Sequence, residues 1–303
     1  IAYQTRRAYL AVQAAERGLE IAEDAVAAAR DHAETTRRLV RDGRIVESDQ
    51  LTAEVNLNEM EANRDQAAEQ VRQARNRLRL VMGLDRGEPL EVAKLPSVDE
   101  LSELADLATL QDQALASRRD LQSLRAQQAA QRARVDMEEA AYSPQVNLVA
   151  SGNTYGENAA YDNTAWRAMA QVRYQLWDGG TASSKAAAAQ RRADRVRAEI
   201  ASRQQEVRSE VRQAVDAIEL ARTRLENSRG TVERARENVT QVDRRYGQGR
   251  TILIDVLQAE GRLVKARSEV LSARHALHAG LLRLAAAQGR LLEENQSVTG
   301  EMP

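Results

Sequence analysis

Apolar and small residues follow a four-three alternation along two long stretches of the chain, one before residue 85 and one after residue 179. This spacing is typical of packed helices, because it places every third or fourth side chain on one face. A glycine-containing turn interrupts each stretch, so each stretch predicts an antiparallel coiled-coil hairpin. The first seam comprises Ala8, Val12, Ala15, Leu19, Ala22, Val26, Ala29, Ala33, Thr36 and Val40 before the turn, and Ala53, Leu57, Met60, Ala67, Val71, Ala74 and Leu78 after it. The second comprises Val207, Val211, Ala214, Ile218, Ala221, Leu225, Ser228, Val232, Ala235, Val239, Val242 and Tyr246, followed by Val256, Ala259, Leu263, Ala266, Val270, Ala273, Leu277, Gly280 and Leu284.

Both turns follow one pattern, Arg-x-x-x-x-Gly-x-x-x-x-x-Asp-x-Leu-x-Ala-Glu, at residues 38–54 and 244–260. The matching pairs are Gly43 and Gly249, Asp49 and Asp255, Leu51 and Leu257, Ala53 and Ala259, and Glu54 and Glu260. A constant offset of 206 residues without gaps indicates a duplicated unit. We expect the glycines to end helices with positive φ. Asp49 and Asp255 either cap the returning helices or have another role at the tips, and the pattern leaves both interpretations open.

The helix predicted from Thr181 to Tyr246 would be roughly 100 Å long at the usual rise per residue. The predicted molecule is therefore elongated. Alanine-rich seams allow helices to approach closely, but each alanine buries little apolar area, so a lone hairpin gains little free energy from packing. We expect lateral association with further copies of the chain.

One segment departs from the helical period. Six of the nine aromatic residues of the chain, four Tyr and two Trp, lie between residues 142 and 177, where apolar residues recur at every second position. The apolar positions are Val146, Leu148 and Ala150, then Trp166, Ala168, Ala170, Val172, Tyr174 and Leu176. A period of two predicts strands. The polar stretch 152–164 between them predicts a β-hairpin with a long loop.

Strands of about ten residues with one apolar face are what a membrane-spanning β-barrel requires. A water-soluble hairpin resting on helices has the same alternation, so the pattern alone leaves both interpretations open. Two strands cannot close a barrel. A barrel would therefore need strands from several copies of the chain.

Charge and composition exclude several classes of function. The chain has 44 basic and 45 acidic side chains, which gives no electrostatic basis for binding nucleic acid. It has no cysteine, so thiol catalysis and cysteine-based zinc sites are excluded. No nucleophile–base arrangement or phosphate loop occurs, and we expect neither enzymatic activity nor a cofactor. His275 and His278 lie three residues apart, but no third ligand accompanies them, so we expect no metal site; His32 stands alone.

These patterns divide the chain into six segments. They are a first helical hairpin (1–85), a connector (86–107), a helix (108–141), a β-hairpin (142–178), a second helical hairpin (179–292) and a tail (293–303).

Four short motifs at the junctions resemble one family, the TolC-like outer-membrane efflux and secretion channels. They are Leu80-Val-Met-Gly-Leu84, Ser117-Arg-Arg-Asp-Leu121, Tyr142-Ser-Pro-Gln-Val146 and Leu176-Trp-Asp-Gly-Gly180. Their order and spacing, together with the duplicated turns, extend the resemblance over nearly the whole chain.

The resemblance implies a mainly α fold, a homotrimer whose helical hairpins form an α-helical barrel across the periplasm and whose β-hairpins contribute to a trimeric transmembrane β-barrel. It implies a passive exit duct in the outer membrane of a Gram-negative cell, surrounded by lipid and working with a periplasmic adaptor protein and an inner-membrane transporter. The connector would form an equatorial belt. An N-terminal helix and a first strand pair would precede Ile1, since such proteins supply four strands per protomer.

The resemblance also assigns roles to individual residues. Tyr246 occupies the position of a gating tyrosine, Asp49 that of its acidic partner, and Asp255 that of an acid lining the narrow entrance. The tips of the hairpins would contact the adaptor through Gly43, Leu51, Gly249 and Leu257. The lipid-facing residues would be Trp166, Val172, Tyr174 and Leu176.

Two positions depart from the family pattern. Gln258 replaces the second acid of the entrance, and Thr251 replaces the gating arginine, with Arg250 one residue earlier. Arg250 is therefore the candidate for an arginine–aspartate latch. Two other classes remain as alternatives: a periplasmic adaptor protein, which also carries helical hairpins, and a structural coiled-coil spacer.

Overall fold

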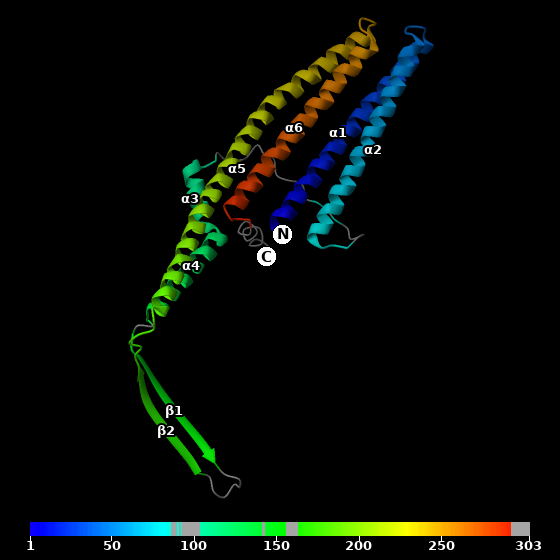
Figure 1. Cartoon of the computed structure of the whole chain (residues 1–303). Coiled ribbons are helices and arrows are strands. Elements are labelled where there is room, and N and C mark those ends of the chain that lie inside the picture. Colours follow the sequence, from blue (N-terminus) through cyan, green and yellow to red (C-terminus); the bar gives the residue numbers. More distant parts are fainter. Residues whose placement is uncertain (86–89, 91, 93–103, 141–142, 156–162, 292–303) are drawn as a thin grey trace, which may run out of the picture. The chain divides into compact units, whose positions relative to one another are not determined.

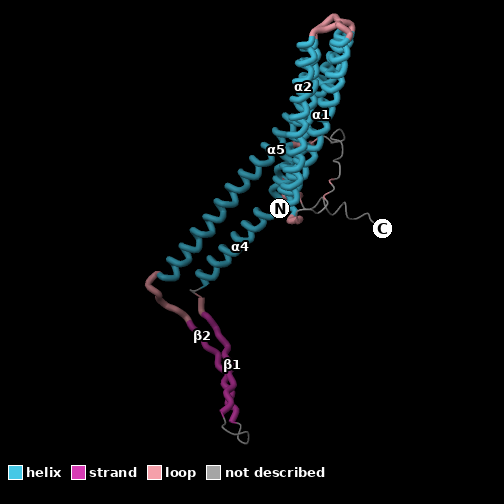
Figure 2. The backbone as a smooth tube through the Cα atoms, turned by 90° about the vertical axis from the view of Figure 1, so that its right-hand side faces the viewer, coloured by secondary structure: helices cyan, strands magenta, loops and turns pink. Residues whose placement is uncertain are grey.

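The computed structural model describes residues 1–85, 90, 92, 104–140, 143–155 and 163–291. These residues are mainly helical, and their strands form one two-stranded sheet (Figure 2). The chain divides into two compact units, Ile1–Ser117 with Val207–Pro303, and Arg118–Glu206. Each unit is described by itself below.

The first unit contains two antiparallel helical hairpins. One is formed by α1 (Ala2–Arg41) and α2 (Glu47–Met82), and the other by α5 (Thr181–Gly247), from Val207 onwards, and α6 (Leu253–Ala287) (Figure 1). A short helix, α3 (Leu107–Ser117), belongs to the same unit. The prediction of long helical hairpins is confirmed.

The seams of both hairpins lie where the sequence pattern predicts them. Every predicted seam residue is buried or half-buried, and Val12, Val211 and Val256 are completely inaccessible to solvent. The helices approach closely at Gly280 of α6, where an added Cβ would lie 2.8 Å from Cγ1 of Ile218 on α5. The four-three alternation therefore marks the packed faces of all four helices.

The turn of the first hairpin ends α1 in a Schellman motif. Gly43 has a φ of +68°, and its N–H donates to the carbonyl of Val40 at 2.9 Å. The N–H of Arg44 donates to the carbonyl of Leu39, also at 2.9 Å. Glycine is favoured here because a Cβ makes a positive φ costly.

The turn of the second hairpin repeats this motif 206 residues later. Gly249 has a φ of +69° and donates to the carbonyl of Tyr246 at 2.8 Å, and Arg250 donates to the carbonyl of Arg245 at 2.8 Å. Each turn thus has the same two backbone hydrogen bonds, made by residues at four equivalent positions. The prediction that both glycines end helices with positive φ is confirmed.

The interpretation of Asp49 and Asp255 as N-caps is wrong. The N-cap residues are Val46 for α2 and Ile252 for α6, and neither makes a side-chain capping bond. Both aspartates lie in the first helical turn, where a negative charge interacts favourably with the helix dipole. Each helix begins three residues earlier than the capping interpretation requires, since the N–H of each aspartate already donates to the N-cap carbonyl at 3.1 Å.

The second unit contains α4 (Arg119–Glu139), the amino-terminal part of α5, and the strands β1 (Gln145–Tyr155) and β2 (Asn163–Arg173). The prediction of one helix over 108–141 is wrong, because the extended backbone of Arg118 separates α3 from α4. Val135 of α4 packs against Ala189 and Ala193 of α5. Asp120 accepts hydrogen bonds from Arg118 at 2.7 Å and Arg203 at 2.9 Å. These two guanidinium groups, Arg118 above all, hold the pKa of the Asp120 carboxyl well below its usual range. The ion pair with Arg203 links α4 to α5.

The strands pair antiparallel, with Val146 opposite Val172 and Gly152 opposite Trp166. Residues directly opposite one another share a face of the sheet, so the predicted apolar positions of both strands lie together on one face. The Trp166 ring covers Gly152, where an added Cβ would lie 2.8 Å from the ring. The prediction of a β-hairpin with one apolar face is confirmed.

The predicted bounds of the strands need correction. The strands include Gly152–Tyr155 and Asn163–Thr164, which the sequence pattern assigned to the loop. Strand β2 ends at Arg173, so Tyr174 and Leu176 follow the strand although they continue its alternation. Cross-strand hydrogen bonds, which the hydrophobic period does not report, fix both ends.

Leu90 and Val92 of the predicted connector pack against Ala8, Val12 and Leu78 of the first hairpin. Most of the connector (86–89, 91 and 93–103) and the predicted tail (293–303) lie outside the described residues. Within the described ranges, no helix is both long enough and apolar enough to cross a membrane.

Candidate functional site

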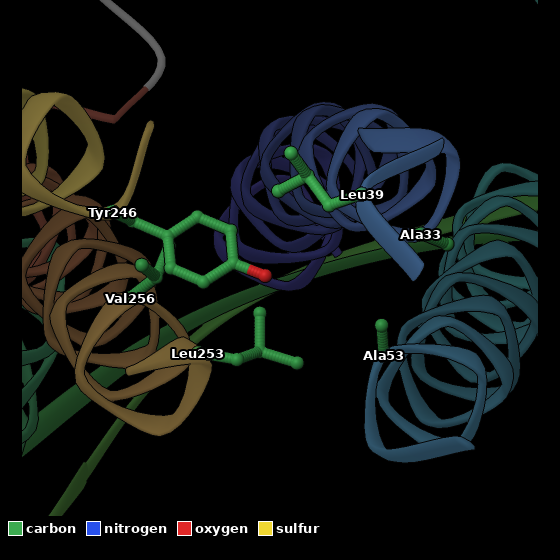
Figure 3. Close-up of a cluster of buried hydrophobic side chains, with 6 residues drawn as sticks. All are labelled: Ala33, Leu39, Ala53, Tyr246, Leu253 and Val256. Atoms are coloured by element: carbon green, nitrogen blue, oxygen red, sulfur yellow. The ribbon is translucent and has the colours of Figure 1, made fainter. Parts of the chain in front are cut away.

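Side chains from both helical hairpins form a buried apolar cluster beside the two turns (Figure 3). The first hairpin contributes Ala33, Leu39 and Ala53, and the second contributes Tyr246, Leu253 and Val256. We call these six residues the tip cluster. It joins the hairpins of one chain by apolar contact.

Tyr246 is the one aromatic residue of the tip cluster. It is only 5% exposed, and Figure 3 shows its ring projecting from α5 toward α1. Its hydroxyl lies 3.4 Å from Oγ1 of Thr36, a completely buried residue of α1. A buried tyrosine whose polar end meets a partner joins two elements both by apolar area and by hydrogen bonding.

A polar contact near the tip cluster joins the same two hairpins. His32 of α1 is buried, and its Nε2 lies 2.7 Å from Oε1 of Glu260 on α6. The hydrogen bond with Glu260 raises the pKa of His32 above its ordinary value, with smaller electrostatic contributions from Asp243 and Asp31. Sequence analysis missed this residue. The available signal was its spacing, since His32 lies three residues after Ala29 on the seam side of the helix.

The carboxylate of Asp255 accepts a hydrogen bond from the hydroxyl of Thr251. The threonine at the expected arginine position therefore holds the acid four residues later in the same turn. Asp255 is exposed, and Asp49 of the other tip is half-buried. Throughout the part of the chain that the structure describes, no ion pair joins Arg250 to either aspartate.

The remaining predicted tip residues differ in exposure. Leu51 is 58% exposed on the first tip, whereas its equivalent Leu257 packs against the tip cluster. Arg250 and Gln258 are exposed. A Cβ added at Gly43 or Gly249 would meet open space, so these glycines are required by their backbone conformation alone.

The predicted lipid-facing residues lie in the second unit. Trp166 and Val172 are on the apolar face of β2, and Tyr174 and Leu176 follow that strand. Leu148 and Trp166 are 83% and 81% exposed, so this apolar face has no partner within the chain's described residues. Such a face requires an apolar environment or further protein to cover it.

His275 and His278 of α6 are half-buried. Burial is the main cause that lowers the pKa of both side chains, with smaller contributions from neighbouring basic groups. Across the described ranges, no group of three or more His, Cys, Asp or Glu residues is placed to hold a metal ion.

Comparison with known proteins identifies a family. Residues 110–290 match the outer membrane efflux protein family, which is more than half of the chain. A comparison with curated proteins found no match.

Solved structures of outer membrane channels have the same fold. The CmeC channel of Campylobacter jejuni is 15% identical, with a TM-score of 0.76 over 99% of this chain and 66% of its own. The open state of the MtrE channel of Neisseria gonorrhoeae is 22% identical, with a TM-score of 0.76 over 95% of this chain and 65% of its own. VceC of Vibrio cholerae is 18% identical, with a TM-score of 0.76 over 95% of this chain and 69% of its own. The chain thus spans about two thirds of the length of these structures.

The resemblance predicted from the junction motifs and duplicated turns is confirmed, as are the mainly α fold and the outer-membrane location. The chain belongs to the outer membrane efflux protein family.

Proposed function

We propose that the full-length protein is a passive exit duct formed by three copies of the chain, with a β-barrel in the outer membrane and a helical barrel in the periplasm. A periplasmic adaptor protein and an inner-membrane transporter deliver the substrate and open the periplasmic end. The duct provides a passage for the substrate and catalyses no reaction.

One observation carries this proposal: the apolar face of a two-stranded sheet is left uncovered. Leu148, Trp166 and Val172 would cost free energy in water, and two strands leave two unpaired edges. A barrel built from strands of several copies pairs every edge and turns the apolar face to lipid. A periplasmic adaptor or a coiled-coil spacer has no use for such a face.

The hairpin tips form the gate in this proposal. Tyr246 holds the second hairpin against the first by its burial against α1 and its contact with Thr36. Asp49, Arg250, Asp255 and Gln258 line the narrow periplasmic entrance, where charged and polar side chains determine which ions pass.

The adaptor docks on the outer surface of the tips. Its contacts are Leu51 and Leu257 together with the backbone around Gly43 and Gly249. The exposed side chains of Val46 and Ile252 add apolar area at equivalent positions of the two turns. Exposed apolar side chains on a turn are suited to binding another protein.

The test is the conductance of the full-length protein in planar lipid bilayers. The proposal predicts a small conductance for the wild type and a larger one for Tyr246→Ala, because loss of the ring frees the second hairpin. The matched control is Val40→Ala, which changes the equivalent residue of the first hairpin. A protein that needs no detergent, remains monomeric and carries no current would contradict the proposal.

A further inference from the structure

Three carboxylates surround the buried ring of His32. Glu260 of α6 lies 2.7 Å from Nε2, and Asp243 of α5 lies 3.9 Å from Nδ1. Asp31, the neighbouring residue on α1, adds a third negative charge. Both ring nitrogens therefore face acids from the second hairpin, although His32 belongs to the first.

The duplicated positions, Glu54 and Asn238, do not form an equivalent contact. Glu54, the equivalent of Glu260, accepts a hydrogen bond from Arg37 at 3.0 Å, so its ion pair stays within α1 and α2. The equivalent of His32 in the second hairpin is Asn238, which cannot be protonated. The contact between His32 and Glu260 is thus particular to the interface between the hairpins.

We propose that His32 is a positioning residue that pins the second helical hairpin to the first, and that its protonation determines how readily the two hairpins separate. This proposal rests on the proposed gate, since separation of the hairpins is the movement that would open it. It adds a titrating group to an interface that otherwise contains the apolar tip cluster and an ion pair between Arg267 of α6 and Asp24 of α1 at 2.9 Å.

The direction of the effect follows from the charges. Imidazolium donates a charge-assisted hydrogen bond to Glu260, and such bonds are roughly twice as strong as neutral ones. His32 has a raised pKa, so it is charged at mildly acidic pH. As the pH rises through that pKa the charge is lost, the pin weakens, and the hairpins separate more readily.

The movement can be measured directly with spin labels. The 303 residues contain no cysteine, so single cysteines introduced at the exposed turn residues Asp42 and Gln248 have no competing site within this part of the protein, and any cysteine outside it is replaced by serine. The full-length protein is prepared so that one copy in each assembly carries the two labels. Pulsed electron resonance then reports the distance between the two tips of one chain.

We expect the ratio of separated to joined tips to rise roughly tenfold between about pH 6 and about pH 8.5, the change that loss of one charge-assisted hydrogen bond produces. His32→Gln should abolish this pH dependence, and Glu260→Gln should reduce it strongly, because Asp243 remains beside Nδ1. Two variants are used because either substitution alone could disturb packing around a buried group.

Two matched controls separate the pin from general effects of pH. Glu54→Gln changes the equivalent acid of the first hairpin, and His278→Gln removes a half-buried histidine of α6. Both controls should keep the tenfold response. Loss of the response in either control would overturn the assignment to His32.

Conductance measured on the same variants distinguishes the proposed role of His32, the pin between the hairpins, from the proposed gate. A tip distance that ignores pH in the wild type, or a response that survives in both His32→Gln and Glu260→Gln, overturns the pin even if the protein conducts. A response that depends on His32 without any change in conductance supports the pin and overturns the proposed gate.

Discussion

The two hairpin tips share a backbone but use their side chains differently. Gly43 and Gly249 end their helices with the same hydrogen bonds, and each returning helix begins at the same distance from its glycine. Yet Leu51 is exposed where Leu257 packs inward, and Glu54 pairs within its own hairpin where Glu260 reaches the other.

This difference shows how a duplicated unit can acquire two roles. The turn requires a glycine with positive φ and two backbone hydrogen bonds, and both copies have them. The side chains of the second copy point toward the first hairpin, with Tyr246 and Glu260 both meeting α1. In the first tip, the ion pair of Glu54 with Arg37 stays within the hairpin, and Leu51 is exposed to solvent. Both tips keep an exposed apolar residue for docking, Val46 and Ile252, but only the second tip is also held against the other hairpin by its side chains.

The largest effect is expected at Tyr246. Tyr246→Ala should destabilise the region around the tip cluster by about 3 to 5 kcal/mol, because it removes a buried aromatic side chain. Its half-buried equivalent Val40, changed to Ala, should cost about 1 kcal/mol. Hydrogen exchange of amides near each tip measures both losses. Equal losses would contradict the division of roles.

The next largest loss of stability is expected for Glu260→Gln, and it should differ from that of Glu54→Gln. Glu260→Gln should cost about 2 kcal/mol at mildly acidic pH, because it removes the charged partner of His32. The raised pKa of His32 means that this stabilisation is fully present below the ordinary value of 6.5 and is lost as the pH rises through the folded-state value. Thermal unfolding at several pH values measures it. Glu54→Gln should leave the pH dependence unchanged, and an equal loss in both variants would remove the distinction.

The two turn glycines should behave alike. Gly43→Ala and Gly249→Ala should each cost about 1 to 2 kcal/mol, because each places a Cβ at a positive φ. Gly261→Ala is the control, since it lies inside α6 with open space around it and should stabilise the helix by about 0.5 to 1 kcal/mol. Thermal unfolding distinguishes the three variants. A loss at only one turn would show that the turns are not equivalent.

The smallest effect is expected at Thr251. Thr251→Val makes the second tip resemble the first, where Ile45 stands at this position, and removes the hydrogen bond to Asp255. We expect a loss of about 0.5 to 1 kcal/mol in stability. Conductance measured in parallel shows whether freeing the Asp255 carboxylate alters the flow of cations. A loss as large as that of Tyr246→Ala would mean that Thr251 is a principal contact of the tip.

Much of the fold could be predicted from the sequence because helix seams and strand faces repeat with short periods. Every predicted seam residue is at least half-buried, and Val146 and Val172 share one sheet face as expected. The ends of the strands could not be predicted, because they depend on pairing between residues such as Tyr155 and Asn163.

The candidate site was harder to predict. Tyr246 was identified by its resemblance to a gating tyrosine, and the structure places its side chain in the tip cluster, with its hydroxyl 3.4 Å from Oγ1 of Thr36 on α1. His32 was missed because its spacing from Ala29 places it on the seam side of the helix but does not identify its partner Glu260, which lies 228 residues away. The capping roles of Asp49 and Asp255 were wrong because a turn motif does not reveal which residue is the first in the helix.

Electron cryomicroscopy of the full-length protein in detergent tests the central claim most directly. If three copies close their strands into a membrane barrel and their hairpins into a tube, the particle will be hollow and threefold symmetric, with the tips of all six hairpins gathered at one end. A compact monomer, stable in plain buffer with its β-hairpin folded against its own helices, would contradict the account.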